Sequence, residues 1–327
     1  MTAWSGRRVV VTGAEGFIGS HLVDALLADG ADVSAFVHYT PSGSGGWLRQ
    51  RDGDVRIIAG DVRDGDRVMA ALEGAEVVFH LAALVGIPYS YECPESYVQT
   101  NVTGTCNVLN AARRRGVERV VHTSTSEAYG TPRYVPIDEA HPLQPQSPYA
   151  ASKVGADMLA LSFHRSFGLP VAVVRPFNTY GPRQSTRAVI PTILAQLCAG
   201  AEEVRVGATW PTRDFNYVTD TVAGFLAVAG CDRALGEVVN VGSGREVSVG
   251  ELVGMLGDVT GRTPAVTTDP RRLRPSSSEV ERLLCDNRRI REWAGWEPQV
   301  PLEEGLRRTA EWVRDNLGLF DPAAYHV

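Results

Sequence analysis

An α/β fold with a doubly wound parallel sheet and a second, smaller α/β domain is predicted by three features of the sequence. Short, almost continuous apolar runs alternate with amphipathic helical segments along the first half of the chain. A glycine-rich turn joins the first of these runs to the first helix. The length of 327 residues exceeds what one compact core usually needs, so the chain suits two domains.

The apolar runs are typical of parallel strands that are covered on both faces. Strands are expected over residues 8–12, 32–37, 55–61, 76–82, 119–124 and 170–176. Helices are expected between them, most clearly at 97–115 and 148–167, and Gly30 stands where the first helix should end. This alternation of strands and helices predicts a Rossmann-type sheet.

The regular alternation loosens after Pro176, and this change predicts the smaller domain. We assign residues 1–177 and 213–234 to the first domain and residues 178–212 and 235–327 to the second. The five cysteines are scattered, with no CxxC pair and no Cys/His cluster, so reduced thiols and no metal site are expected.

Charge and hydropathy exclude several functional classes. A formal net charge of −6 argues against nucleic-acid binding. No apolar run approaches the roughly 18 residues of a membrane-spanning helix, and no signal-peptide pattern precedes the first strand. We therefore expect a cytoplasmic protein with no membrane partner.

The glycine-rich turn predicts a dinucleotide site. Gly13, Gly16 and Gly19 follow the first strand and begin the first helix, with the spacing GxxGxxG. Glycines allow the backbone to approach a pyrophosphate, and the helix N-terminus supplies N–H groups and a positive dipole end. A turn that is merely rich in glycine is the simpler interpretation, but its place at the first strand–helix junction favours a cofactor.

The phosphate state of that cofactor stays open at this stage. An acidic residue at the end of the second strand usually holds the ribose hydroxyls of NAD, but Val37 stands there. No arginine replaces it to bind the 2′-phosphate of NADP, although His38 is a candidate. We expect NAD by a slight preference, with NADP not excluded.

Two side chains four residues apart on the helix at 148–167 predict acid–base chemistry. Ser147 can cap this helix, and Tyr149 and Lys153 share one of its faces. Ionising a tyrosine near neutral pH requires a pKa shift of roughly three units, or about 4 kcal/mol. A lysine and a cationic nicotinamide in a dry cleft can supply that shift. An exposed Tyr and Lys on a helix surface is the alternative.

The strand at 119–124 leads into the polar stretch "HTSTSEAYG". A buried strand is not expected to end in several hydroxyl groups and a carboxylate. Together with the glycine turn, "YAASK", "VRPFNTYGPRQ" and "RDFNYVTD", this stretch resembles the extended short-chain dehydrogenase/reductases that modify nucleotide sugars, over essentially the whole chain. The resemblance implies that Tyr149 is the base on the sugar 4-hydroxyl. It also implies that Lys153 holds the cofactor ribose and tunes Tyr149, and that Thr125 hydrogen-bonds the same hydroxyl.

The resemblance further implies two sets of binding residues. The cofactor contacts would be Gly13, Gly16, Phe17, Ile18, Gly19, His38, Asp61, Val62, Leu81, Ala82, Ala83, Tyr149 and Lys153. The substrate, a nucleotide-diphosphate sugar, would contact Asn178, Arg187, Ala188, Val189, Arg213 and Arg274, with Arg183 a weaker candidate. Each arginine is equally well explained, on its own, as a solvated surface charge.

The triplet Thr125, Ser126 and Glu127 narrows the reaction. With a glutamate at this position, the chain resembles the 4,6-dehydratases, which are lyases. A carboxylate there can remove the C5 proton of the sugar and help the C6 hydroxyl to leave. UDP-glucuronate decarboxylases have the same triplet, and 4-epimerases share the fold. The stretches "LVGIPYSYECPESYVQTN" and "RLRPSSSEVERLLCDN" are most similar to hexosamine 4,6-dehydratases, which favours that reaction. Glu127 as a structural cap of the next turn is the alternative.

Two further expectations follow from the resemblance. A homodimer should form through a four-helix interface made by residues 97–115 and 148–167 of two chains, with Val102, Val108, Leu109, Val154, Met158 and Leu161 as its apolar positions. A non-catalytic regulator that senses the dinucleotide is disfavoured, because such regulators tend to lose the Tyr/Lys pair.

Overall fold

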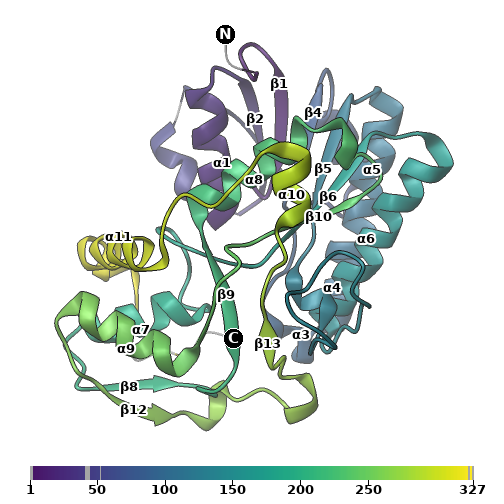
Figure 1. The fold of residues 1–327 in the computed structure, drawn as a ribbon. Helices are drawn as coiled ribbons and strands as arrows, with labels where there is room; N and C mark the ends of the chain where they lie inside the picture. Colours follow the sequence, from purple (N-terminus) through teal and green to yellow (C-terminus); the bar gives the residue numbers. More distant parts are fainter. Residues whose placement is uncertain (1–2, 41–44, 52, 323–324, 326–327) are drawn as a thin grey trace.

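The structure is a computed structural model that describes residues 3–40, 45–51, 53–322 and 325 of the chain. A large domain holds a seven-stranded sheet, and a smaller domain lies beside its edge (Figure 1). The strand order is β10-β6-β5-β4-β1-β2-β3, and every neighbouring pair in it is parallel. The sheet consists of β1 (Arg8–Thr12), β2 (Asp32–His38), β3 (Arg56–Gly60), β4 (Val77–His80), β5 (Arg119–Thr123), β6 (Val171–Pro176) and β10 (Val238–Val241).

Helices cover both faces of this sheet, which confirms the predicted doubly wound α/β fold. One face carries α1 (Phe17–Ala28), α8 (Val218–Ala229) and α10 (Arg288–Ala294). The other face carries α2 (Gly65–Ala71), α5 (Gly104–Arg115) and α6 (Pro148–Phe167). Successive residues of one strand serve the two cores: Val9 and Val11 are in the first, and Val10 is in the second.

The order in which strands join the sheet changes direction at β1. It runs outward from β1 to β2 and β3, and then returns to place β4 on the other side of β1. Ligands of doubly wound sheets bind at the carboxyl ends of the strands beside such a switch point. The glycine-rich turn after β1 and the loop after β4 both lie at this place.

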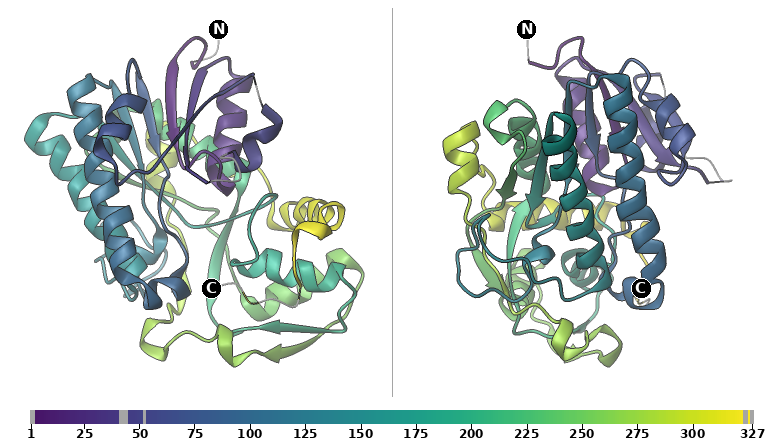
Figure 2. Two further views of the ribbon diagram at one scale, coloured as in Figure 1. Left: turned by 180° about the vertical axis from the view of Figure 1, so that it is seen from behind. Right: turned by 90° about the vertical axis from the view of Figure 1, so that its right-hand side faces the viewer.

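The segment between β4 and β5 is helical but irregular. It contains α3 (Ile87–Glu92), α4 (Pro94–Tyr97) and a π-helical stretch, Val98–Thr103, which continues into α5. The predicted helix at 97–115 is therefore present with a different hydrogen-bond pattern in its first part. The two long helices α5 and α6 lie side by side along one face of the sheet (Figure 2).

The smaller domain is built around β9 (Thr212–Tyr217), which has partners on both sides. Its sheet consists of β7 (Asn178–Tyr180), β9, β11 (Glu246–Ser248) and β13 (Arg282–Leu283). A separate parallel pair joins β8 (Glu203–Val206) to β12 (Ala265–Thr268). The helices α7 (Val189–Cys198), α9 (Val249–Thr260) and α11 (Leu302–Asp315) share one apolar core with these strands. Short 3-10 helices lie at Gly46–Arg51, Ser126–Tyr129, Asp232–Ala234, Pro270–Arg272, Ser276–Ser278 and Leu317–Leu319.

The predicted domain boundaries require two corrections. The segment 235–327 was assigned to the second domain, but β10 pairs with β6 in the large sheet and α10 packs on that sheet. The segment 213–234 was assigned to the first domain, but β9 belongs to the smaller sheet and only α8 returns to the large one. The chain crosses between the domains more often than the loosened pattern indicated, because an edge strand can be added to a sheet from any point of the sequence.

Candidate active site

The glycine-rich turn lies between the end of β1 and the start of α1, against the loop after β4. Gly13 has a φ of 67°, and a Cβ on it would lie 2.8 Å from the backbone nitrogen of Ala82. A Cβ on Gly19 would lie 2.2 Å from the carbonyl oxygen of Gly13. Close backbone packing therefore requires these two glycines. A Cβ on Gly16, the N-cap of α1, would meet only the Gly13 carbonyl oxygen, at 3.3 Å, so packing constrains Gly16 less than it constrains Gly13 and Gly19.

The loop after β4 is tied to the same turn by a buried hydroxyl. Oγ1 of Thr12 accepts hydrogen bonds from the backbone N–H groups of Leu81, at 3.2 Å, and Ala82, at 3.1 Å. The predicted cofactor residues Leu81, Ala82 and Ala83 thus lie beside the glycine-rich turn. Two further predicted cofactor residues begin α1: Phe17 packs against the apolar core of the smaller domain and Ile18 against that of the large domain.

A buried asparagine joins this loop to the helix that carries the catalytic candidates. Oδ1 of Asn101 accepts from the N–H of Leu84, at 2.8 Å, and its Nδ2 donates to the Leu84 carbonyl, at 3.0 Å. The same Nδ2 donates to the hydroxyl of Ser152, at 2.9 Å. Asn101 lies in the π-helical stretch. Its side chain therefore joins the loop after β4 to Ser152 of α6, the residue before Lys153.

The three predicted contacts around the far end of the cofactor site differ in their environment. The carboxylate of Asp61 accepts hydrogen bonds from Nε and Nη2 of Arg63, the latter at 2.6 Å, and these lower the pKa of Asp61. Val62 is a core residue, 5 % exposed. The backbone N–H of His38 donates to Oε1 of Glu15, at 2.7 Å. Sequence reasoning missed Glu15, although it stands inside the glycine-rich turn.

The catalytic candidates Tyr149 and Lys153 are buried at the start of α6. Ser147 caps this helix as predicted, with its Oγ accepting from the N–H of Ala150 at 3.1 Å. Tyr149 is 8 % exposed and Lys153 is 3 % exposed, so the exposed-surface alternative is wrong. The ring of Tyr97 packs edge-on against that of Tyr149, with 6.2 Å between centroids.

Burial moves the pKa values of this pair in opposite directions. It raises the pKa of the Tyr149 phenol, the adjacent Thr125 hydroxyl lowers it, and the carboxylate of Glu127 raises it further. Burial lowers the pKa of Lys153 to about 8, and the carboxylate of Asp157 raises it. In the protein alone the ammonium is thus not the dominant influence on the phenol.

Beneath the pair lies a buried polar network that the sequence did not reveal. Oδ2 of Asp157 accepts from the hydroxyl of Ser124, at 2.5 Å, and from Nη2 of Arg175, at 2.7 Å. Nε of Arg175 also donates to Ser124, and its guanidinium lies 4.6 Å from the ring centre of Tyr129. Part of the polar end of β5 is therefore explained by contacts within the protein. Ser124 has its hydrogen-bond partners, Asp157 and Arg175, within the protein.

The two remaining members of the triplet, Ser126 and Glu127, start the 3-10 helix at Ser126–Tyr129. The cap of this turn is Thr125, whose Oγ1 accepts from the N–H of Glu127 at 3.3 Å, so the capping alternative for Glu127 is wrong. Ser126 is 3 % exposed. One carboxylate oxygen of Glu127 lies 3.7 Å from Nη1 of Arg274, with the glutamate side chain 11 % exposed.

Arg213 and Arg274, from separate segments of the smaller domain, share one carboxylate. Oε1 of Glu279 lies 3.0 Å from Nη2 of Arg213 and 3.4 Å from Nη1 of Arg274. Burial lowers the pKa of Arg274, but the charges of Glu127 and Glu279 outweigh it and raise the pKa overall. These two guanidinium groups therefore lie side by side, and the carboxylates of Glu279 and Glu127 balance their charge.

The other predicted substrate residues lie between the start of β7 and the first turn of α7. Oδ1 of Asn178, on β7, is buried without a hydrogen-bond partner among the described residues. Ala188 and Val189 form the N-terminus of α7, and Arg187 precedes them as an exposed side chain. Arg183 pairs with Asp24 of α1, at 2.8 Å, so it joins the two domains.

The described residues contain neither a cluster that could bind a metal ion nor a helix that could span a membrane. In that part of the chain no group of three or more His, Cys, Asp and Glu side chains is arranged to hold a metal ion. Among the same residues, no helix combines the length and apolar character needed to cross a bilayer.

Comparison with known proteins identifies the family. The family model described as GDP-mannose 4,6 dehydratase matches residues 10–309. A dTDP-glucose 4,6-dehydratase of Streptomyces griseus is 37% identical over 322 residues, covering 96% of both chains. A UDP-glucose 4-epimerase of Mycolicibacterium smegmatis is 36% identical over 314 residues, covering 94% of this chain and 99% of the relative.

Solved structures agree with this assignment. The dTDP-glucose 4,6-dehydratase DesIV of Streptomyces venezuelae, solved with bound NAD, has a TM-score of 0.88 and 35% identity over 96% of this chain and 99% of its own. An epimerase of Methanothermobacter thermautotrophicus has a TM-score of 0.89 and 30% identity, covering 97% of this chain and 95% of its own. The chain therefore belongs to the GDP-mannose 4,6 dehydratase family, among the NAD-dependent nucleotide-sugar epimerases and dehydratases of the extended short-chain dehydrogenase/reductases.

Proposed function

We propose that the protein is a nucleotide-sugar 4,6-dehydratase that uses NAD and forms a 4-keto-6-deoxy sugar. The observation that carries this proposal is the carboxylate of Glu127, held in a buried position near the Tyr149 phenol and beside Arg274. Epimerisation at C4 removes and returns one hydride and needs no second base. Elimination across C5 and C6 does need one, and Glu127 is the carboxylate available for it.

NAD fits the residues at the switch point of the sheet. The N-cap Gly16 and the first turn of α1 would hold the pyrophosphate, and Leu81, Ala82 and Ala83 would line the nicotinamide side. When bound, NAD supplies an acceptor for the C4 hydride and later its donor. Lys153 would hold the adjacent ribose, where its ammonium also favours an ionised Tyr149.

Tyr149 would take the proton of the sugar 4-hydroxyl, with Thr125 donating a hydrogen bond to the same oxygen. Burial of both residues excludes water from this transfer. Glu127 would then remove the C5 proton, which the C4 carbonyl makes acidic, and protonate the departing C6 hydroxyl. Ser126 would assist that proton transfer. Overall, the C4 hydrogen reaches C6, a solvent-derived proton enters C5 and one water leaves.

The diphosphate of the substrate would bind Arg213 and Arg274. Guanidinium groups suit phosphate oxygens, and this pair already shares the carboxylate of Glu279. A diphosphate that engages Arg274 would release Glu127 from its ion pair and leave its carboxylate facing the sugar. Asn178, Arg187, Ala188 and Val189 would complete the nucleotide pocket.

A panel of UDP-, GDP- and dTDP-sugars tests the reaction class by product mass. Loss of 18 mass units, the mass of one water, supports the dehydratase. Loss of carbon dioxide would instead identify a decarboxylase, and an unchanged mass with an inverted C4 centre an epimerase. Wild-type reaction in heavy water should place deuterium at C5, while C6 receives the original C4 hydrogen.

The variant Glu127→Gln separates oxidation from elimination. The amide is nearly isosteric with the carboxylate but cannot accept the C5 proton, so product should fall by roughly 10² or more. Nicotinamide absorbance should still rise on addition of substrate and persist. Tyr149→Phe is the matched control and should abolish the absorbance change itself. Full dehydration by Glu127→Gln would refute the assigned role and reopen the epimerase and decarboxylase alternatives.

We also propose a homodimer through the first part of the 97–115 segment and α6. Met158 is 46 % exposed and Val98 is 51 % exposed, and both are large apolar side chains. Val102 and Val154 are half-buried beside them. Of the predicted interface positions, Val108, Leu109 and Leu161 instead belong to the core of their own chain.

A further inference from the structure

A carboxylate lies at the end of β2, where the sequence pattern lacks one. It belongs to Glu15, which stands between Gly13 and Gly16 in the turn after β1. Its Oε1 accepts a hydrogen bond from the backbone N–H of His38, the last residue of β2, at 2.7 Å. Its Oε2 is buried and has no hydrogen-bond partner in the part of the chain that the structure describes. A buried carboxylate oxygen without a partner is costly, so a ligand group is expected to complete it.

The end of β2 is the place where a doubly wound sheet receives the adenosine ribose of a dinucleotide. An acidic residue supplied by β2 itself usually binds the ribose hydroxyls and distinguishes NAD from NADP. In this chain Val37 and His38 occupy the end of that strand, and neither side chain is a carboxylate. Glu15 reaches the same point from the preceding turn, and only its Oε1 is used there.

The neighbouring arginines on the described part of this edge are engaged elsewhere. The guanidinium of Arg63 forms a forked pair with Asp61, with Nη2–Oδ2 at 2.6 Å. Nε of Arg67 donates to the Ala59 carbonyl, at 2.8 Å. A 2′-phosphate at this edge would therefore meet the negative charge of Glu15, while the guanidinium of Arg63 is already paired with Asp61.

We propose that Glu15 selects NAD over NADP by accepting a hydrogen bond from the adenosine ribose and by repelling a 2′-phosphate. The selecting carboxylate is thus supplied by the glycine-rich turn, not by the strand that usually carries it. The proposal concerns only cofactor choice, so it stands or falls independently of the dehydratase reaction.

Glu15→Gln tests the proposal with little change of shape, because the amide oxygen can still accept from the His38 N–H. Dissociation constants of NAD⁺ and NADP⁺ would be measured on the cofactor-depleted full chain by quenching of tryptophan fluorescence. The wild type should prefer NAD⁺ by about tenfold or more, since like charges placed together cost several-fold in affinity. In Glu15→Gln this preference should fall by about fivefold or more.

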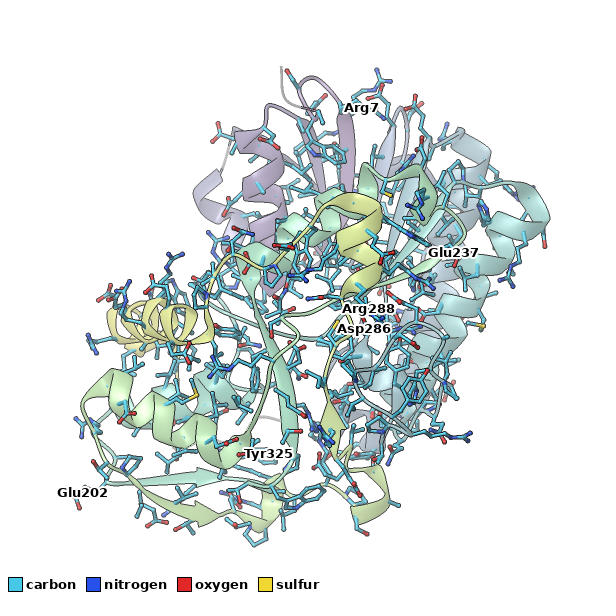
Figure 3. The ribbon with its side chains drawn as sticks, viewed as in Figure 1. Arg7, Glu202, Glu237, Asp286, Arg288 and Tyr325 are labelled. Atoms are coloured by element: carbon cyan, nitrogen blue, oxygen red, sulfur yellow. The ribbon has the colours of Figure 1, made fainter. Side chains whose placement is uncertain are left out.

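The matched control is Glu202→Gln, because Glu202 is an exposed glutamate at the far end of the smaller domain, opposite Arg7 of the large domain in Figure 3. Its constants for both dinucleotides should equal those of the wild type. The dinucleotide released on denaturing the purified wild type should be NAD. A fall of less than about fivefold in the preference of Glu15→Gln would overturn the proposal and leave Glu15 a purely structural tie. Equal wild-type constants for the two dinucleotides would overturn it even if the variant fails to fold.

Discussion

Replacing Asp157 by asparagine should weaken both the stability of the large domain and the acid–base pair above it. The carboxylate is completely buried and is surrounded by Ser124, Arg175 and His122, whose Nε2 lies 3.2 Å from Oδ1. Asparagine keeps the shape and one acceptor oxygen. It removes the negative charge, and Arg175, which is 1 % exposed, is then buried without a counter-charge.

The size of the effect can be bounded in two ways. Removing one partner of a buried ion pair costs about 3–5 kcal/mol, because the other charge is left uncompensated. Burial raises the pKa of Asp157, but hydrogen bonds with His122 and Ser124 and the charge of Arg175 bring it down to about 2 from an ordinary 3.8. That depression corresponds to about 2.5 kcal/mol of stability at neutral pH. The two figures agree in order of magnitude.

The pH dependence has a defined sign. Because the pKa of Asp157 is depressed in the folded state, its contribution to stability is complete above pH 3.8 and is lost as the pH falls toward about 2. Chemical denaturation at pH 7 should give Asp157→Asn a free energy of unfolding lower by about 3 kcal/mol. The difference between wild type and variant should shrink in the acid range.

A double-mutant cycle with Arg175→Met distinguishes pairing from simple packing. The double variant should be less destabilised than the sum of the single variants by at least about 1.5 kcal/mol. Additive single effects would refute the idea that Asp157 and Arg175 stabilise the fold as a charge pair.

The same variant has a functional consequence through Lys153. The pKa of Lys153 is lowered by burial to about 8, and Asp157 partly opposes this decrease. Without the carboxylate the ammonium loses its proton at a lower pH. The alkaline limb of the pH profile of kcat should therefore move to lower pH in Asp157→Asn. An unmoved limb would show that Asp157 does not act on the acid–base pair.

Two further outcomes are expected. Lys153→Met should abolish activity but raise the free energy of unfolding of the cofactor-free protein at pH 7 by up to about 3 kcal/mol. The reason is that burying the charged ammonium costs stability in full below pH 8 and costs nothing above pH 10.5. An unchanged denaturation midpoint would contradict this. Met158→Glu should convert a dimer to monomers in sedimentation at micromolar concentration, whereas Leu319→Glu, a change at an exposed leucine outside the proposed interface, should not. A monomeric wild type would refute the interface.

The sequence predicted what depends on local pattern. The first strand and the helix at 148–167 have the predicted bounds, since their apolar runs, the Ser147 cap and Pro148 are all local signals. The turn glycines and the Tyr149/Lys153 pair were also found because their spacing is short. The domain boundaries failed at β10 and β9, because tertiary contacts that no local pattern encodes decide which sheet a strand joins.

The site residues that were missed share a different property. Asp157 and Glu15 act through partners that are 18 and 23 residues away in sequence, Arg175 and His38. A signal for Asp157 existed, because it continues the spacing of four that joins Tyr149 to Lys153 on one face of α6. For Glu15 the only signal was an acidic residue inside a glycine-rich turn, next to a strand end that lacked one.

These missed residues would place negative charge at both ends of the proposed cofactor site. Asp157 opposes the decrease in the pKa of Lys153, at the proposed nicotinamide end, and Glu15 contacts His38 at the proposed adenosine end. The substrate end is the reverse: Arg213 and Arg274 place positive charge there, and Glu127 and Glu279 neutralise it in the protein alone. In the proposed complex a diphosphate would replace the carboxylate of Glu127 on Arg274. Because Glu127 is also the base proposed for elimination, the proposal couples substrate binding to activation of that base through Arg274.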